Sequence, residues 1–168
     1  MADPLILTLD LGAHQARYDA LRHAHFPPRP YRLPAHLTLF HQLPGEEEAG
    51  VADHLDRVAR AAAPLPLRFA EAMPLGSGVA IRVRSAAALA LRAALAAHWA
   101  DHLTPQDRGF RPHVTIQNKV DAETARATLA AVAEGFEPHD GASPALLLWR
   151  YRGGPWEAAG RFAFPKAV

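Results

Sequence analysis

The amino-acid sequence predicts one domain of strands and helices in which a single structural pattern occurs twice. The tetrapeptide His36-Leu37-Thr38-Leu39 returns 77 positions later as His113-Val114-Thr115-Ile116. Each copy lies in a short apolar run typical of a strand, where successive side chains face opposite sides. The elements around each copy also follow one order: strand, helix, motif strand, helix, strand. We therefore expect two similar halves related by an approximate twofold axis.

In the first half, apolar alternation predicts a strand at the N-terminus, followed by a short helix and the first motif strand. After Pro44-Gly45, apolar residues at helical spacing predict an amphipathic helix with acidic residues at its positive N-terminal end. A further strand ends this half. The predicted elements are strands Leu5 to Leu11, Leu37 to Leu43 and Leu65 to Glu71, and helices Ala13 to His25 and Glu46 to Ala63.

The second half repeats this series. Ser85 is expected to cap one helix and Asp121 to open the next, because short polar side chains accept hydrogen bonds from the first turn. The turn Gly153-Gly154 is expected to separate two final strands. The predicted elements are strands Val79 to Arg84, Pro112 to Val120, Ala145 to Tyr151 and Trp156 to Phe164, and helices starting at Ser85 and Asp121. The domain is expected to span 1–168, with lobes near 1–75 and 76–168.

Composition limits the class of protein. The chain has 168 residues, nearly half of them hydrophobic, and no apolar run long enough to cross a bilayer. The start Met1-Ala2-Asp3-Pro4 lacks the pattern of a secretory signal. Cysteine is absent, which excludes disulfides, thiolate metal sites and a cysteine nucleophile. We expect a monomeric cytoplasmic protein without membrane contact.

The charge pattern favours a local anion site over a nucleic-acid coat. The net charge is only +1, yet 16 of the 18 basic residues are arginine, whose planar fork matches phosphate oxygens. A GC-rich genome would favour the same arginine-rich composition. The position of each arginine must therefore decide which of them are candidates for binding phosphate. Arg29 and Arg32 precede the first motif, Arg111 precedes the second, and Arg150 and Arg152 share one face of a late strand.

The two motifs carry the candidate chemistry. Strand alternation turns each histidine to the same side as its threonine, while Leu37, Leu39, Val114 and Ile116 are expected to point into the core. Two imidazoles and two hydroxyls are thereby offered to one site. Opening a cyclic phosphodiester needs a base on one side of phosphorus, an acid on the other, and donors to the nonbridging oxygens. That scheme requires no metal and no cofactor, and spacing leaves open which histidine is the acid.

The motif pair resembles the two-histidine (2H) phosphoesterase superfamily, which includes bacterial 2'-5' RNA ligase-like proteins and RNA 2',3'-cyclic phosphodiesterases. The segments at 34–40 and 111–116, and the closing hairpin 151–164 with Trp156-Glu157, are similar to the corresponding family segments. The resemblance covers almost the whole chain. It departs after the first motif, where His41-Gln42-Leu43 stands in place of the common Phe-Leu-Gly, and at Lys119.

The resemblance implies a bilobed α+β fold, with two antiparallel sheets facing a central cleft and helices on the outside. It also implies that His36 is the general acid and His113 the base, and that Thr38 and Thr115 bind phosphate oxygens. The expected substrates are RNA ends with a 2',3'-cyclic phosphate or small cyclic nucleotides, with reversible 2'-5' ligation as a further activity. The natural substrate is left open.

Other candidates have alternative interpretations. Phe40 is predicted on the motif face, where it would stack on a base, but core packing is an equal alternative. Arg111, Arg32 and Arg152 are candidate substrate-binding residues. His41, together with His98, His102 and His139, is interpreted as an ordinary surface or boundary residue. His23 and His25 do not share a helical face and make a poor metal pair.

Two other functions remain as alternatives. The same cleft could bind RNA or a nucleotide without performing chemistry. A histidine metalloenzyme is disfavoured, because the chain contains no His-Glu-x-x-His or similar close ligand set.

Overall fold

The structure is a computed structural model that describes residues 2–166. The predicted domain end residues, 1 and 167–168, lie outside this part of the chain. Its strands are β1 (Leu5–Leu9), β2 (Leu37–Leu43), β3 (Leu65–Leu75), β4 (Gly78–Arg84), β5 (His113–Gln117), β6 (His139–Ser143), β7 (Ala145–Tyr151) and β8 (Trp156–Ala163). Its α-helices are α1 (Gln15–His25), α2 (Glu48–Arg60), α3 (Ala86–His98) and α4 (Ala122–Gly135). None of these helices combines the length and apolarity that crossing a bilayer requires.

The strands form two four-stranded antiparallel sheets, which confirms the expected α+β class. The strand orders are β2-β1-β7-β8 and β5-β4-β3-β6. The sheets do not follow the two halves of the sequence. β3 from the first half pairs with β4 of the second, whereas β7 from the second half pairs with β1 of the first. Each sheet therefore contains a strand from both predicted lobes.

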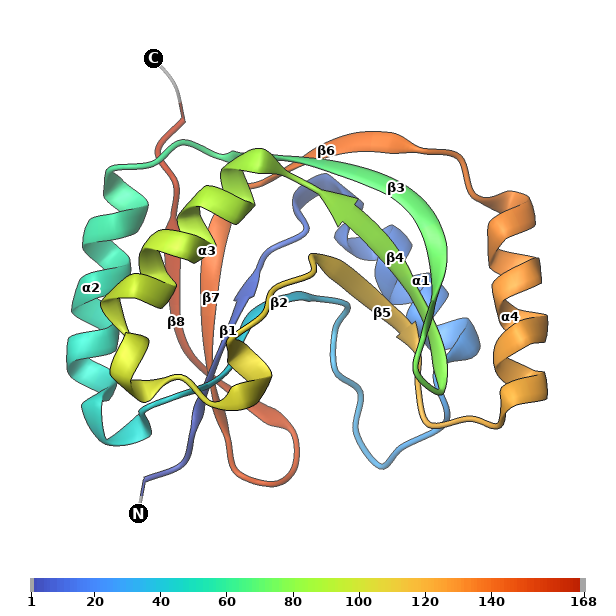
Figure 1. Ribbon diagram of the computed structural model, residues 1–168, viewed down its shortest axis with the longest axis horizontal. Coiled ribbons are helices and arrows are strands. Elements are labelled where there is room, and N and C mark those ends of the chain that lie inside the picture. Colours follow the sequence, from blue (N-terminus) through green and yellow to red (C-terminus); the bar gives the residue numbers. More distant parts are fainter. Residues whose placement is uncertain (1, 167–168) are drawn as a thin grey trace.

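The helices cover the outer sides of the two sheets (Figure 1). α2 packs against β7 and β8, and α4 packs against β3 and β4. α1 follows β1 in the chain but packs against β5 of the other sheet. The two motif strands β2 and β5 are edge strands that meet in the middle of the molecule (Figure 1). The chain crossings thus place both motifs at the junction of the sheets.

Both predicted helix caps are present. The Ser85 hydroxyl accepts a hydrogen bond from Ala88 N at 3.0 Å and donates one to Pro66 O at 2.6 Å. The Asp121 carboxylate accepts a hydrogen bond from Thr124 N at 2.7 Å. These bonds satisfy main-chain groups that the first helical turn leaves without a partner.

Several strands differ from the prediction: β1 ends at Leu9 rather than at Leu11, and β3 continues past Glu71 to Leu75. β6 was not predicted, because its sequence His-Asp-Gly-Ala-Ser has low strand propensity; its pairing with β3 in the folded sheet overrides that propensity. The second motif strand ends at Gln117 rather than at Val120. Lys119 has φ +60°, a left-handed conformation that ends an extended segment.

The core lies between the sheets and their helices. As predicted, Leu37, Leu39, Val114 and Ile116 are almost completely buried. Tyr18 and Phe69 are the large aromatic residues on the α1 and β3 side, and their rings stack at a centroid distance of 4.9 Å. The buried faces of the motif strands thus anchor the opposite faces, which carry the histidines.

Candidate active site

The two motif strands present their polar residues in the same way. His36 and Thr38 are partly exposed on one strand, and His113 and Thr115 are partly exposed on the other. The intervening residues are buried, so the alternation predicted from the sequence is observed in both strands. Since β2 and β5 pack against each other, the four polar side chains belong to neighbouring strands.

Both histidines are held by the same main-chain contact. Nδ1 of His36 lies 2.7 Å from Pro34 O, and Nδ1 of His113 lies 2.6 Å from Arg111 O. A carbonyl oxygen can only accept, so each Nδ1 carries the proton and donates it. The Nε2 atom of each ring is then the one free to meet a substrate. An orienting bond on the far nitrogen is how proteins fix the tautomer of a working histidine.

The surroundings of His36 lower its pKa. Burial lowers the pKa of His36 to about 4, although the Pro34 carbonyl opposes this, and the positive charges of Arg22, His41 and His113 lower it further. His36 is therefore neutral near pH 7 in the ligand-free protein, with a lone pair on Nε2.

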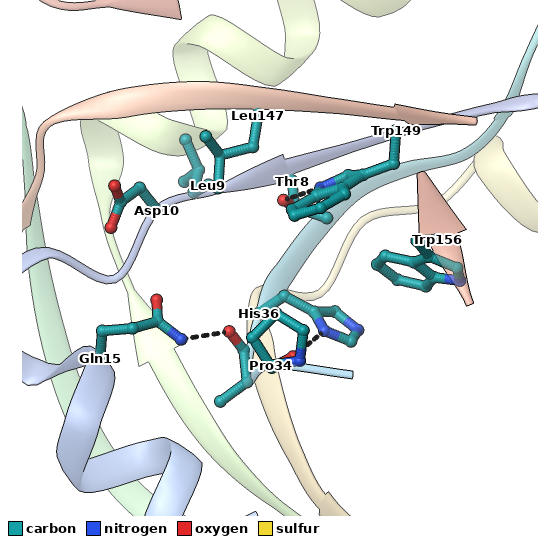
Figure 2. A pocket seen from close by; sticks show the side chains of 10 residues that line it. Thr8, Leu9, Asp10, Gln15, Pro34, His36, Leu147, Trp149 and Trp156 are labelled. Carbon is teal, nitrogen blue, oxygen red and sulfur yellow. Dashed lines mark hydrogen bonds between the residues drawn. The ribbon is translucent and has the colours of Figure 1, made fainter. Parts of the chain in front are cut away.

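A cavity of about 220 Å³ lies beside His36 (Figure 2). The Trp156 ring packs against the His36 ring at a centroid distance of 4.5 Å, and the Trp149 ring lies 6.0 Å from Trp156. Trp149 Nε1 donates a hydrogen bond to the buried Thr8 hydroxyl at 3.0 Å. The residues lining the cavity are Thr8, Leu9, Asp10, Gln15, Pro34, Ala35, His36, Leu147, Trp149 and Trp156. Sequence reasoning did not assign the tryptophans to the site.

A polar network from α1 fixes the residue that precedes His36. Asp19 Oδ1 accepts a hydrogen bond from Ala35 N at 2.7 Å, and Gln15 Nε2 donates one to Ala35 O at 2.7 Å. Gln15 also donates to Asp19 at 3.0 Å, which joins the two contacts into one unit. Both main-chain groups of Ala35 are thereby held, and this limits the positions available to His36.

Two buried arginines brace the motif strands. Arg22 Nη1 on α1 donates to Thr115 O at 3.0 Å, and Arg92 Nε on α3 donates to Leu39 O at 2.9 Å. Each arginine thus crosses from a helix to one motif strand. Sequence reasoning missed both residues, although Ala-Leu-Arg occurs at 20–22 and again at 90–92 and was an available signal.

The prediction that Phe40 lies on the motif face is wrong. Its ring is completely buried and packs edge-on against Trp99 at a centroid distance of 5.7 Å. The cause is a β-bulge in β2, where Leu7 pairs with Phe40 but Thr8 pairs with Thr38. The extra residue turns both Leu39 and Phe40 into the core. In β5, Ile116 and Gln117 are buried in the same way after a matching register shift.

The three candidate arginines lie in different surroundings. Arg111 and Arg32 are exposed in the segments that precede the motif strands, and Arg111 contributes its carbonyl to His113. Arg152 forms ion pairs with Asp3 at 3.2 Å and Glu157 at 3.1 Å, which occupy its guanidinium.

Another arginine faces the second motif. Arg82 lies directly opposite His113 in the β4–β5 pair, and opposing residues share one face of a sheet. Its Nε lies 3.0 Å from Glu71 Oε1. Sequence reasoning did not single out Arg82, because the pairing of β4 with β5 is a tertiary property. Across residues 2–166, no three histidine, aspartate, glutamate or cysteine side chains are grouped to hold a metal ion.

Comparisons with known proteins assign the family. The model of the 2'-5' RNA ligase superfamily matches residues 11–155. The chain belongs to the 2'-5' RNA ligase superfamily. This is the superfamily of two-histidine phosphoesterases. None of the curated proteins compared with the chain matched it.

Solved structures share the fold of this superfamily member. E. coli LigT complexed with 3'-AMP is 20% identical, with a TM-score of 0.68, and the match covers 99% of this chain and 100% of LigT. TT0787 of Thermus thermophilus is 21% identical, with a TM-score of 0.67, and the match covers 98% and 100% of the two chains. A protein described as a phosphoesterase is 21% identical, with a TM-score of 0.66, and the match covers 98% and 99%. At these identities the comparison establishes the fold.

Proposed function

We propose that this superfamily member is a metal-independent phosphoesterase that opens 2',3'-cyclic phosphates of RNA ends or small nucleotides. The observation that carries the proposal is the matched pair of histidines, each with Nδ1 bound to the carbonyl two residues earlier and Nε2 free. A pair of imidazoles oriented in this way suits general acid and base catalysis. No cofactor takes part in the proposed reaction.

In the proposed reaction, His113 Nε2 removes a proton from water as the water oxygen attacks phosphorus. His36 donates a proton to the ribose oxygen that leaves as the ring opens. Thr38 and Thr115 donate hydrogen bonds to the nonbridging oxygens as negative charge grows there. With a ribose hydroxyl in place of water, the same step would form a 2'-5' linkage, which is the reversible ligation that we include in the proposal.

The acid role of His36 sets a condition on substrate binding. Its pKa of about 4 leaves the ring neutral in the free protein at pH 7. A phosphate anion beside the ring stabilises the imidazolium and raises this pKa. Binding of the substrate would therefore favour protonation of His36, and His36 must be protonated to act as the general acid.

The similar structures support the substrate class. Crystal structures of E. coli LigT are described as complexes with 3'-AMP, NADP⁺, phosphate and ATP. We propose that the present chain likewise binds phosphate-bearing nucleotides at its histidine pair. We further propose that it acts as a monomer in the cytoplasm, and gel filtration of the purified protein tests the monomer.

The decisive experiment measures turnover of adenosine 2',3'-cyclic phosphate with EDTA present. We expect activity in the unmodified protein and a loss of about 10²–10⁴-fold in kcat for His36→Ala and for His113→Ala. His102→Ala is the matched control, since His102 is exposed on a short 3₁₀ helix (Ala100–His102) outside the cavity beside His36. Full activity in both motif variants would contradict the mechanism. Nucleotide binding by calorimetry with no product between about pH 5 and 8 would favour the binding-only alternative.

A further inference from the structure

A buried carboxylate that the proposed reaction does not use lies beside the first motif strand. Asp107 ends the short 3₁₀ helix η4 (Pro105–Asp107), and its side chain is 1% exposed. It accepts hydrogen bonds from His41 N at 2.8 Å and from Gln42 N at 2.8 Å. Burial alone would raise the pKa of Asp107, but the hydrogen bonds from His41 and Gln42 hold it below its usual value. The carboxylate is therefore ionised.

The main-chain contacts of Asp107 stabilise the irregular end of β2. Leu5 pairs with Leu43 and Leu7 with Phe40, so His41 and Gln42 together oppose Ile6. A bulge of this kind leaves main-chain N–H groups without ladder partners. The Asp107 carboxylate supplies the missing acceptors. Arg92 fixes this loop by donating to the Asp107 carbonyl.

Asp107 makes a third contact that supporting the bulge does not require. Its Oδ1 accepts a hydrogen bond from His41 Nδ1 at 3.0 Å. The ring is thereby oriented with Nε2 free, as it is in His36 and His113. The His41 side chain is 45% exposed, so Nε2 is open to a ligand. A histidine held by a buried carboxylate is a frequent arrangement at functional sites.

His41 faces the same side of the sheet as the catalytic residues. It opposes Ile6, and Ile6 alternates with Thr8, which lines the cavity beside His36. The register shift between Leu7 and Thr8 brings His41 to this face, whereas strict alternation from His36 would have turned it away. From Thr38 it lies about 7 Å along the strand, because the bulged residue adds little rise. That spacing is similar to the separation of neighbouring phosphates in an RNA strand.

The charge at this end of the site suits an anion. The ionised Asp107 carboxylate is buried behind His41, and the next residue, Arg108, is exposed and has no ion-pair partner within residues 2–166. When its ring is protonated, His41 donates from Nδ1 to Asp107 and presents an Nε2–H donor, so His41 and Arg108 can both donate to a phosphodiester group beyond the reacting phosphate.

We propose that His41, oriented by Asp107, binds the phosphodiester group adjacent to the reacting cyclic phosphate, so that the site favours an RNA end over a mononucleotide. This inference rests on the proposed function. An RNA end has this second phosphate group and a mononucleotide does not, so the contact would distinguish the two classes of substrate.

The test compares two substrates in one set of variants. The substrates are adenosine 2',3'-cyclic phosphate and a ribotrinucleotide that ends in a 2',3'-cyclic phosphate, and the readout is the ratio of their kcat/KM values. In His41→Asn the amide nitrogen replaces Nδ1 and keeps a donor for Asp107, but Nε2 is lost. The ratio is taken as the value for the trinucleotide divided by the value for the mononucleotide. We expect this variant to lower the ratio about tenfold, chiefly by raising the KM of the trinucleotide. His41→Gln, whose amide nitrogen reaches towards the Nε2 position, should recover part of the ratio.

Further variants separate the possible outcomes. His102→Ala, the exposed control, should keep the unmodified ratio. Asp107→Asn should lower the ratio, and adding it to His41→Asn should lower the ratio no further, because both changes act on one contact. A ratio unchanged in His41→Asn overturns the role of His41 while leaving the proposed function intact. No turnover of either substrate by the unmodified protein would overturn both proposals.

Discussion

Arg22 Nη1 donates a hydrogen bond to the main-chain oxygen of Thr115 at 3.0 Å. The bond links α1, which follows a strand of one sheet, to the motif strand of the other sheet. Arg22 also packs over the Phe26 ring, with 4.1 Å between the guanidinium carbon and the ring centroid. Arg22 thus fixes α1 against the second motif strand.

Replacing Arg22 by methionine should destabilise the fold. Thr115 O would lose its charged donor, and such a loss costs about 1–3 kcal/mol of unfolding free energy. Urea denaturation measures the change. Arg126→Met is the matched control, since Arg126 is exposed on α4, and its unfolding free energy should change by less than about 0.5 kcal/mol. Equal stability of the two variants would contradict the bracing role of Arg22.

His36 should titrate far below an ordinary histidine. Burial lowers its pKa to about 4 in the free protein, and NMR of the ring proton should give a midpoint near that value. Adding inorganic phosphate or 3'-AMP should raise the midpoint, because an anion favours the imidazolium. A midpoint near 6.5 without ligand, or one that is insensitive to phosphate, would contradict the electrostatic account of the site.

The same pKa makes stability depend on pH. Between about pH 6.5 and pH 4 the unfolded chain binds a proton at position 36 that the folded chain does not. The contribution of His36 to the unfolding free energy is therefore fully present above pH 6.5 and is lost as the pH falls towards 4. In His36→Asn the unfolding free energy should fall less steeply over this range. Denaturation series at several pH values compare the slopes, and identical slopes would refute the prediction.

Removing the Asp19 carboxylate should disturb catalysis from a distance. Asp19→Ala leaves the buried Ala35 N–H without an acceptor and frees the residue before His36. We expect a loss of about 1–3 kcal/mol in unfolding free energy and a lower kcat on the cyclic nucleotide. Asp19→Asn retains an acceptor oxygen and should recover much of the kcat. Recovery of stability without recovery of kcat would argue against a positioning role.

The motif hydroxyls should matter to kcat more than to folding. Thr38→Val keeps the shape of the side chain but removes a donor to the developing charge on phosphate. We expect a decrease of about 10²–10³-fold in kcat with little change in KM. Thermal melting should show that the variant is folded. Unchanged kcat in both Thr38→Val and Thr115→Val would remove the threonines from the proposed mechanism.

Local rules were sufficient for much of the fold. Strand alternation placed Leu37 and Val114 in the core and turned His36 and His113 to the opposite face, as the structure confirms. The caps at Ser85 and Asp121 follow from hydrogen bonding within one helical turn, so sequence reasoning found them. Local rules could not predict that β3 pairs with β4 of the second half or that β7 pairs with β1 of the first half. Strand partners far apart in sequence leave no local pattern.

The sequence by itself determined the starts of α3 and α4 and the pair of histidine motifs, because each depends on neighbours within a few residues, and the family resemblance carried by those motifs implied the α+β class. Only the tertiary structure decided that Phe40 is buried, that His41 faces the cavity side with Asp107 behind it, and that Arg22 and Arg92 brace the motif strands. The physical reason for the placement of Phe40 and His41 is a pair of register shifts in β2. The first shift turns Phe40 into the core and the second brings Leu43 to the core. Between them, the N–H groups of His41 and Gln42 bond to a carboxylate more than sixty positions away.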